Sequence, residues 1–515
     1  MAISVVAATS ARGSYFDVIG VTALRATTNL DGSGISVGQA EASDSTTTNN
    51  VFEVNPAAVS QPTNLFTYFI SNPPYLTFSS STNYTNPLGV ESGHADDVGL
   101  DFYGPSGGVA TNVEHVDNYQ ADGFYGYNIA GGHAIGERIV NQSFTFGTND
   151  PTLDQNYDNY AAQHGVLFIT GAGFPGGPIY SPATCYNGIG VSVTGVSNPL
   201  YGPTPDGRSK PDICAPGPQG AETSYSTPLV AGAATLLMQA GLRGDGGSDT
   251  NSAVDIRVIK ALLLNGAVKA FDWTNAPAFP LDARWGAGVL DVFNSYEQLI
   301  GGRQTNFVST TVAAGAAHPP VLATNTIGAS SGWDFETIAS SVRNDAVNHY
   351  FFDVTNTAND GAFAATATLA WNRQAGQSAI NVLNLFLYNA ANGNLVLCST
   401  SQVDNVQEIF VPRLAQGRYD LEVWKAGGLG DASQSETYAL AFEFSEPMLS
   451  AQRSGRNVLL SWPLYPDGFL VESTTNLAAP ENWTTNLPAP VLTNDQNEVL
   501  AGVTNAAQFF RLRTP

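Results

Sequence analysis

Charged residues are scarce in this chain, and lysine is almost missing. Only 12% of the 515 residues are Asp, Glu, Lys or Arg, against about 25% in an average globular protein. The 44 acidic residues outnumber the 20 basic ones, which leaves a formal net charge of −24. Such a chain repels phosphate backbones and offers no basic cluster to an anionic membrane surface. Nucleic-acid binding and membrane-surface binding are therefore excluded.

Long hydrophobic runs and cysteines are also few. No run approaches the about 20 apolar residues of a membrane-spanning helix, so no membrane span is expected. Three cysteines, Cys185, Cys214 and Cys398, allow at most one internal disulfide, which excludes a disulfide-built scaffold. Hydrophobic residues make up 43% of the chain, which excludes general disorder. At about 150 residues per domain, the length predicts about three domains.

The N-terminal residues MAISVVAATSARGSYFD have no basic region and only a short apolar stretch, so they do not resemble a signal peptide. The rest of the chain is rich in Asn, Thr, Ser and Gly and poor in Lys, a composition typical of exported proteins. We expect a secreted, monomeric protein whose signal and pro-segment are not part of this sequence.

The residue pattern divides the chain into three segments. Residues 1–302 alternate short apolar strands with helical stretches, which predicts an α/β domain. Residues 303–446 are alternating and strand-like, with the hairpin signal Asn392-Gly393, and predict an antiparallel β-sandwich. Residues 447–515 predict a small β-rich module, which is too short for a large core and should pack on its neighbour.

Individual elements are clearest in the first segment. Strands are expected at residues 34–40, 137–143, 166–170 and 188–194. Helices are expected at residues 152–164, 228–240 and 255–265.

The most informative stretch is SKPDICAPGPQGAETSYSTPLVAGA, residues 209–233. A Thr-Ser pair followed by Pro228 indicates a turn from a strand into a helix, with the proline in the first helical turn. Ser224 would lie at or just before the helix N-terminus, where free N–H groups and the helix dipole stabilise an oxyanion. The small Ala231 and Gly232 would let this helix pack tightly against the sheet. Taken alone, the pattern also describes a serine that only caps a helix.

Several motifs, in order along residues 1–300, resemble those of the subtilisin-like serine peptidases, the subtilase family. K-P-D-x-x-A-P-G followed by T-S-x-x-x-P-x-V-A-G resembles their serine motif. GHADDVG, which contains His94, resembles their histidine motif, and GSGISV resembles the strand that leads to their catalytic Asp. GVA, IVNQS, HGVLFITGAG and GAGVLDVFNSYEQL follow in the family's order. The resemblance implies a parallel-sheet α/β domain with helices on both faces.

The resemblance also implies a catalytic triad. Ser224 would attack a peptide carbonyl, and His94 would take the proton as base. The register places Glu41 where the family has its Asp, with Asp44 as the alternative acid. An imidazole paired in this way predicts activity that rises with a pKa of about 6–7. The remaining histidines lack the motif and are expected to be structural or on the surface: His115, His133, His164, His318 and His349.

Three departures from the family pattern concern the substrate cleft. Phe174 stands where the family has an asparagine that completes the oxyanion hole, and loss of that donor costs about 10²–10³ in turnover. Thr145 and Phe146 stand where glycines line the substrate pocket, which predicts a narrower pocket. Glu222 adds a carboxylate just before the Thr-Ser pair.

The resemblance brings the turn around Cys185 close to the K-P-D strand that contains Cys214. A Cys185–Cys214 disulfide is therefore a candidate, and free buried thiols are the alternative. Asp212 in the same strand is a candidate cation ligand. The family implies structural calcium, at a position that the sequence does not fix, and no catalytic cofactor.

Residues 349–444 resemble the pre-peptidase C-terminal type of β-sandwich found in many secreted peptidases. The usual D-L-D-L-Y-L-Y appears here as VLNLFLY, residues 382–388, so its first carboxylates are missing and a cation site there is not expected. In the last module, Trp462 and Trp483 are expected to belong to the core rather than to a carbohydrate-binding surface.

These patterns predict a secreted serine endopeptidase that cleaves peptide or protein substrates through a Glu–His–Ser triad and an acyl-enzyme. Two alternatives stay open. One is a pseudo-peptidase that holds peptide with weak or no cleavage. The other is a subtilase-fold esterase that acts on ester polymers; because no G-x-S-x-G sequence lies at a predicted turn from a strand into a helix, a lipase fold is not expected.

Overall fold

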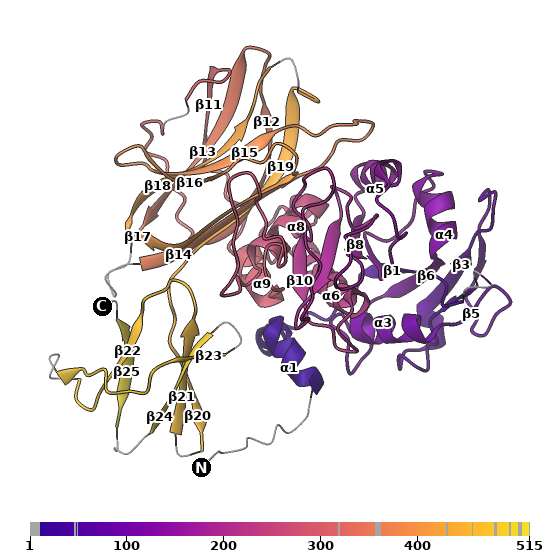
Figure 1. Ribbon diagram of the computed structural model, residues 1–515, viewed down its shortest axis with the longest axis horizontal. Coiled ribbons are helices and arrows are strands. Elements are labelled where there is room, and N and C mark those ends of the chain that lie inside the picture. Colours follow the sequence, from indigo (N-terminus) through magenta and orange to yellow (C-terminus); the bar gives the residue numbers. More distant parts are fainter. Residues whose placement is uncertain are drawn as a thin grey trace.

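The computed structural model describes residues 11–513 apart from 46, 47, 49, 318–319, 356–361, 429–430, 456, 478–481, 494–495 and 503–506. The predicted fold class is confirmed, with an α/β domain followed by antiparallel β-sheets (Figure 1). In Figure 1 the α/β domain lies at the right, the β-sandwich at the upper left and the last module at the lower left. None of the described helices is long and apolar enough to cross a membrane.

An eight-stranded sheet forms the centre of the α/β domain. Its order is β10-β9-β8-β7-β1-β6-β3-β4, and every neighbouring pair is parallel except β3 and β4. The strands are β1 (Ser36–Glu41), β3 (Phe66–Ile70), β4 (Ser79–Ser81), β6 (His115–Gln120), β7 (Ile139–Gln142), β8 (Leu167–Gly171), β9 (Ile189–Val193) and β10 (Ile213–Ala215). All residues of β7, β8 and β9 are buried, as in parallel sheets that helices cover on both faces.

The two faces of this sheet carry different helices. On β8, the ring of Phe168 contacts Tyr157 and Tyr160 of α5 (Pro151–His164). Gly171 of the same strand lies against Thr223 of α6 (Thr223–Arg243). Because alternate residues of a strand point to opposite faces, α5 and α6 cover opposite sides of the sheet. Helices on both faces are therefore confirmed.

The predicted helices at 152–164 and 255–265 agree with α5 and α8 to within a residue. The helix predicted at 228–240 is longer, because α6 begins at Thr223 and contains Pro228 in its interior. The other helices and short elements of the domain are α1 (Ala11–Val18), α2 (Val21–Thr27), β2 (Val51–Glu53), η1 (Thr63–Leu65), β5 (Val90–Glu91), α3 (Gly93–Tyr103), α4 (Ala121–Gly123), η2 (Phe124–Ile129), α7 (Thr250–Ala253), α8 (Ile256–Asn265) and α9 (Val292–Ile300).

Two antiparallel sheets form the β-sandwich, with a hydrophobic core between them. The five-stranded sheet contains β11 (Val308–Ala313), β13 (Asn344–Val354), β18 (Gly417–Lys425), β15 (Leu383–Asn389) and β16 (Asn394–Ser399) in that order. The four-stranded sheet contains β12 (Ser331–Ala339), β19 (Ser435–Ser445), β14 (Ala362–Trp371) and β17 (Val406–Ala415) in that order. The predicted hairpin at Asn392-Gly393 is confirmed, because β15 pairs with β16 and Gly393 has a φ of 73°.

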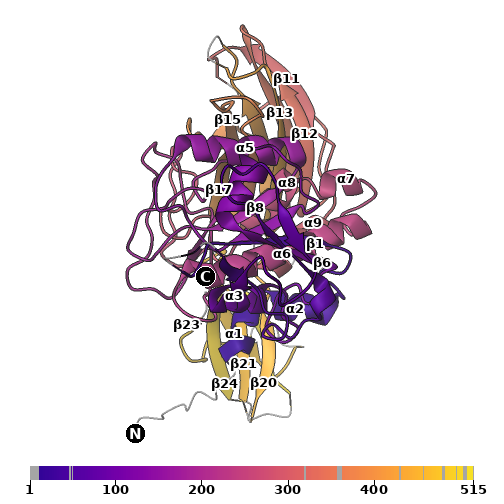
Figure 2. The ribbon, with the colours of Figure 1, turned by 90° about the vertical axis from the view of Figure 1, so that its right-hand side faces the viewer.

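The α/β domain and the sandwich share one interface. Helices α8 and α9 lie against the four-stranded sheet (Figures 1 and 2). Apolar residues of that sheet, Trp333 and Ala441 among them, belong to the same core cluster as the α/β domain. Thr368 donates to the side chain of Asn265 at 3.0 Å, and Lys269 forms a buried ion pair with Glu408. The sequence pattern thus changes near residue 302, between the α/β domain and the sandwich, although the hydrophobic core continues from one into the other.

The last module has a small core of its own. Its strands are β20 (Ser450–Ser454), β21 (Asn457–Pro463), β22 (Leu470–Thr474), β23 (Val491–Thr493), β24 (Gln496–Gly502) and β25 (Phe509–Arg513). Trp462 lies in that core, together with Ala362 of the sandwich strand β14. Trp483 is half-buried beneath the guanidinium of Arg511.

Candidate active site

His94 lies in the first turn of α3, at the carboxyl edge of the central sheet. Ser92 caps this helix by accepting the N–H of Ala95, and its own hydroxyl donates to Asp44 at 2.7 Å. Asp44 also accepts the backbone N–H of His94 at 3.5 Å. Asp44 therefore holds the start of the helix and contacts the backbone of His94, not its imidazole.

Glu41 is the last residue of β1, and its side chain is fully buried. Its Oε2 lies 2.9 Å from Nδ1 of His94. Its Oε1 accepts the side-chain N–H of Gln39 at 2.8 Å, and Gln39 in turn accepts the hydroxyl of Tyr103 at 2.5 Å. Both oxygens of Glu41 are thus held, so the carboxylate is fixed in the orientation that meets the imidazole.

Ser224 is the second residue of α6, and its side chain is half-buried. The helix N-cap is Glu222, whose side chain makes no capping bond, so Ser224 is not a cap. The N–H groups of the first helical turn have no acceptor within the helix and face the cleft end of α6. The sequence predicts the oxyanion site at these N–H groups, and that role stays a prediction.

Pro228 explains an unusual contact of Ser224. A proline inside a helix lacks the N–H that would reach the carbonyl four residues earlier, here that of Ser224. That carbonyl instead accepts the hydroxyl of Ser143 at 2.9 Å, and the Ser224 hydroxyl donates to the Ser143 carbonyl at 3.2 Å. The two serines therefore tie the N-terminus of α6 to the segment after β7.

Two residues close to Ser224 in sequence, Tyr225 and Glu222, interact with His94. The ring of Tyr225 is 6.1 Å from the imidazole, centroid to centroid. The charge of Glu222 acts on the imidazole as well. The Ser224 hydroxyl donates to Ser143 and not to His94 in this structure, and catalytic hydrogen bonds commonly form or tighten only when substrate binds.

Small residues bring α6 close to its neighbours. The hydroxyl of Thr223 donates to the carbonyl of Gly173 at 2.7 Å, which anchors the loop after β8 to the helix. A Cβ on Gly232 would lie 2.5 Å from Cβ of Val109, so this glycine allows close packing against the segment after α3. Helix α6 packs against strands β7, β8 and β9 as predicted, and Gly232 itself approaches Val109.

A small pocket of about 40 Å³ opens next to the Ser224 side chain. Residues of three segments line it, the one after β7, the one after β8 and the start of α6: Ser143, Phe144, Thr145, Gly171, Gly173, Phe174, Glu222, Thr223 and Ser224. Phe174 leaves 69% of its surface exposed, so its ring is not packed into the wall. Thr145 lines the pocket as expected, whereas Phe146, the other residue expected to narrow it, is not among the lining residues and Phe144 is.

The charge of His94 depends on three carboxylates. Burial is the largest single effect and disfavours the imidazolium, but Glu41, Asp44 and Glu222 together outweigh it, so the pKa of His94 rises to about 9. The value is above the expected 6–7. Glu41 contributes most to this rise in the pKa of His94, and the charges of Asp44 and Glu222 contribute less.

The sequence model of the subtilase family matches residues 99–288. This part of the chain is a subtilase domain. Subtilases are serine peptidases, so the expected family and the serine-peptidase class are confirmed. The matched range includes Ser224 and begins after Glu41 and His94. The resemblance of residues 349–444 to a pre-peptidase C-terminal domain stays a prediction.

Solved protease structures align with the chain at low identity. Proteases from Pseudoalteromonas arctica align at 18% identity over 56% of this chain and 97% of theirs, with a TM-score of 0.40. Tripeptidyl peptidase 2 aligns at 13% identity over 79% of this chain, with a TM-score of 0.34. The alignment covers 44% of that peptidase. No curated protein matches the chain.

The candidate disulfide of this subtilase domain is wrong. Cys185 and Cys214 are both free and buried, and Cys398 is free as well. The thiol of Cys214 donates to the carbonyl of Arg284 at 3.4 Å, whereas Cys185 lies in the core beside the charges of Asp158 and Lys210. Burial raises the pKa of the Cys185 and Cys214 thiols to about 12, so both stay protonated and unreactive.

The proposed cation site at Asp212 is wrong as well. Lys210 and Lys260 are buried on either side of its carboxylate, with Nζ atoms 2.5 and 3.3 Å from the two oxygens. The N–H of Gly190 donates to the same carboxylate at 2.6 Å. Two ammonium groups already neutralise Asp212, so it does not fit a metal ion. Structural calcium stays a prediction, and no position is assigned to it.

The sequence analysis did not identify two residues of the site, Gln39 and Tyr103. Gln39 donates to Glu41, and Tyr103 donates to Gln39. Gln39 could have been found, because it lies two residues before Glu41 and therefore on the same face of β1. Tyr103 lies at the far end of α3 and offers no such signal.

The other described histidines have structural partners. His115 lies 3.2 Å from Asp117, and the ring of His133 stacks on Tyr127 at 4.0 Å. His164 contacts the ring of Tyr160. His318 lies outside the described residues, and His349 belongs to a buried cluster in the sandwich.

Proposed function

We propose that this chain is a secreted serine endopeptidase with Ser224 as nucleophile, His94 as general base and Glu41 as the acid that orients the imidazole. The observation that carries the proposal is the 2.9 Å contact between Glu41 Oε2 and His94 Nδ1, on a helix that packs against α6. A carboxylate in this position holds the proton on Nδ1 and leaves Nε2 free to take the proton of the serine.

The reaction then follows from the geometry. The Ser224 oxygen attacks the substrate carbonyl while its proton moves to Nε2 of His94. The N–H groups at the start of α6 stabilise the developing oxyanion. His94 gives the proton to the leaving amine, which leaves an ester between Ser224 and the acyl part of the substrate. Water hydrolyses that ester by the same route in reverse.

Secretion and internal cleavage are the finer parts of the proposal. The low lysine content and the many Asn, Thr, Ser and Gly residues support export. Family resemblance supports cleavage within chains. The test is mass spectrometry of an unfolded protein substrate whose two ends are chemically blocked. Internal fragments are expected, and release of terminal peptides alone would overturn the endopeptidase assignment.

The raised pKa of His94 predicts an alkaline enzyme. Only the neutral imidazole can accept a proton, so kcat/KM should rise about tenfold per pH unit and level off near pH 9. Glu222→Gln removes an exposed negative charge from beside the imidazole and should move this rise to lower pH. The measurement is a pH profile of kcat/KM for both proteins. A plateau that is already complete at pH 7 would contradict the prediction.

The same shift affects stability in a defined direction. Because the folded pKa of His94 lies above its usual 6.5, the imidazolium stabilises the folded state fully below about pH 6.5. That contribution is lost as the pH rises through about 9. The enzyme should therefore be less stable in the pH range where it is most active.

The exposed Phe174 gives a test of the oxyanion site. Phe174→Asn should raise kcat by about tenfold or more, with little change in KM, because an amide there would stabilise charge that develops only in the transition state. Phe174→Ala is the matched control, since it also removes the ring without adding a donor. With 69% of the ring exposed, neither change leaves a buried void. Equal kinetics of the two variants would contradict a missing donor.

The alternative donor in the same pocket is the hydroxyl of Thr145. If Thr145 already completes the oxyanion site, Thr145→Val should lower kcat while Phe174→Asn has no effect. The two variants therefore distinguish a missing donor from a relocated one.

The pseudo-peptidase alternative also has an observation in its favour. The family's oxyanion asparagine is absent, and a largely protonated His94 weakens the base at neutral pH. Labelling by a fluorophosphonate at pH 9 separates the two functions, because only an activated Ser224 reacts.

A further inference from the structure

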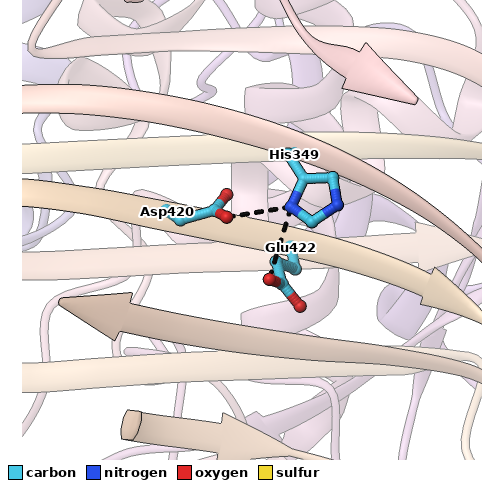
Figure 3. A group of neighbouring side chains, drawn as sticks. All are labelled: His349, Asp420 and Glu422. Carbon is cyan, nitrogen blue, oxygen red and sulfur yellow. Dashed lines mark hydrogen bonds and ion pairs between the residues drawn. The ribbon is translucent and has the colours of Figure 1, made fainter. Parts of the chain in front are cut away.

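A buried polar cluster lies in the five-stranded sheet of the sandwich, in a domain separate from the triad. His349 of β13 pairs directly across from Glu422 of β18, and Asp420 lies two residues away on the same face of β18. The three side chains are 1%, 0% and 0% exposed, respectively. Figure 3 shows that the two carboxylates point at one ring nitrogen of His349.

The distances in this cluster are close to the edge lengths of a small coordination polyhedron. Nδ1 of His349 lies 2.8 Å from Oδ2 of Asp420 and 3.3 Å from Oε1 of Glu422. All three potential ligand atoms lie within 4.8 Å of one another. In a tetrahedral zinc site with bonds of about 2.0–2.2 Å, ligand atoms lie about 3.3–3.5 Å apart. A small relaxation of Asp420 would therefore admit the ion.

The other ring nitrogen of His349 has a partner of its own. Nε2 lies 2.8 Å from the hydroxyl of Thr310 on the edge strand β11. When Nε2–H donates to that hydroxyl, the imidazole is neutral and Nδ1 presents its lone pair to the two carboxylates. Metal-binding histidines are commonly oriented in this way by an acceptor on the second nitrogen.

The carboxylates of Asp420 and Glu422 have more acceptor atoms than there are hydrogen-bond donors around them. Oδ1 of Asp420 and Oε2 of Glu422 are buried without a hydrogen-bond partner, and Oε1 of Glu422 has only the 3.3 Å ion-pair contact with His349. Arg418, on the same strand, places its guanidinium 2.8 Å from Asp353. With both carboxylates ionised, the three groups carry a net charge of −1 in the interior even when His349 is protonated. Such an uncompensated buried charge is costly, and a dication with a neutral imidazole would remove it.

We propose that His349, Asp420 and Glu422 bind one Zn²⁺ ion that joins β13 to β18. One imidazole and two carboxylates suit zinc, whereas calcium prefers six to eight oxygen ligands. The site is structural, because it lies within the sandwich sheet and apart from Ser224, and it is different from the calcium that the family implies. The ion would neutralise the two carboxylates and hold the β13–β18 pair next to the sheet edge.

The test uses the full chain after treatment with a chelator, titrated with ZnCl₂ in equilibrium dialysis with metal analysis. The wild-type chain should bind one Zn²⁺ ion. Glu422→Gln and Asp420→Asn should each lose this ion, with a Kd for Zn²⁺ at least about 100-fold weaker than that of the wild type. Asp353→Asn is the matched control, because it removes a carboxylate from β13 outside the cluster. Zn²⁺ should raise the melting temperature of the wild type and of Asp353→Asn by about 5 °C, and that of the cluster variants much less.

A crystal of the wild-type chain soaked in ZnCl₂ and measured at the zinc absorption edge decides the position without any variant. An anomalous peak between the three side chains is expected. The proposal is overturned if the peak lies only at His94 or is missing, or if Glu422→Gln binds zinc like the wild type. It is equally overturned if Ca²⁺ alone, and not Zn²⁺, occupies the cluster.

Discussion

Replacing Ser224 by Ala is expected to lower kcat by about 10⁴–10⁶ and to abolish fluorophosphonate labelling, with nearly unchanged melting temperature. The hydroxyl is half-buried and makes one hydrogen bond of 3.2 Å to the Ser143 carbonyl, so its removal leaves little to destabilise the fold. The carbonyl of Ser224, which ties α6 to Ser143, is unaffected by the substitution.

Ser226→Ala is the matched control for this experiment. Ser226 lies one half-turn further along α6, and its buried hydroxyl donates to the carbonyl of Ala215 at 3.0 Å. Its loss should cost about 1 kcal/mol of stability and leave labelling intact. Labelling that persists in Ser224→Ala, or disappears in Ser226→Ala at unchanged fold, would show that Ser224 is not the nucleophile.

Glu41→Gln is expected to lower kcat by about 10⁴ while the protein stays folded. Two donors meet the Glu41 carboxylate, the side-chain N–H of Gln39 and Nδ1–H of His94. A glutamine amide has only one oxygen. If this oxygen faces Gln39, the amide N–H₂ faces Nδ1 and forces the proton onto Nε2, where it blocks proton transfer from Ser224.

Asp44→Asn is the control that separates the two candidate acids. Asp44 contacts the Ser92 hydroxyl and the His94 backbone, so its amide variant should keep most of the activity. Loss of its charge should move the alkaline rise of kcat/KM slightly to lower pH, because Asp44 contributes to the raised pKa of His94. A harmless Glu41→Gln beside an inactive Asp44→Asn would reverse the assignment of the acid.

Much of this molecule follows from local pattern. Apolar runs bounded by turn residues locate the buried strands β7, β8 and β9, and helical spacing locates α8, because these periods reflect which side of each element meets the core. Local pattern also explains why the sequence predicts the start of α6 at residue 228 rather than at Thr223. Pro228 suggests a first turn, and its tolerance inside the helix depends on Ser143, which is distant in sequence.

The subtilase motifs identify Glu41, His94 and Ser224 as candidates, and only the tertiary structure brings the elements that carry them together. The motifs do not decide between Glu41 and Asp44, because the side chain that reaches the imidazole depends on how β1 meets α3. They also suggest a disulfide and a cation site that buried lysines and separate sulfur environments exclude.

The amino-acid sequence was sufficient to predict the fold class and the residue types of the serine-peptidase chemistry, since periodicity and motif order are properties of neighbouring residues. The tertiary structure decided which charges share one environment. The pKa of His94 depends on Glu41, Asp44 and Glu222 from three different segments, and the cluster of His349, Asp420 and Glu422 exists only because β13 pairs with β18 in one register. Electrostatic energies depend on distance and burial, and neither quantity is encoded in sequence spacing.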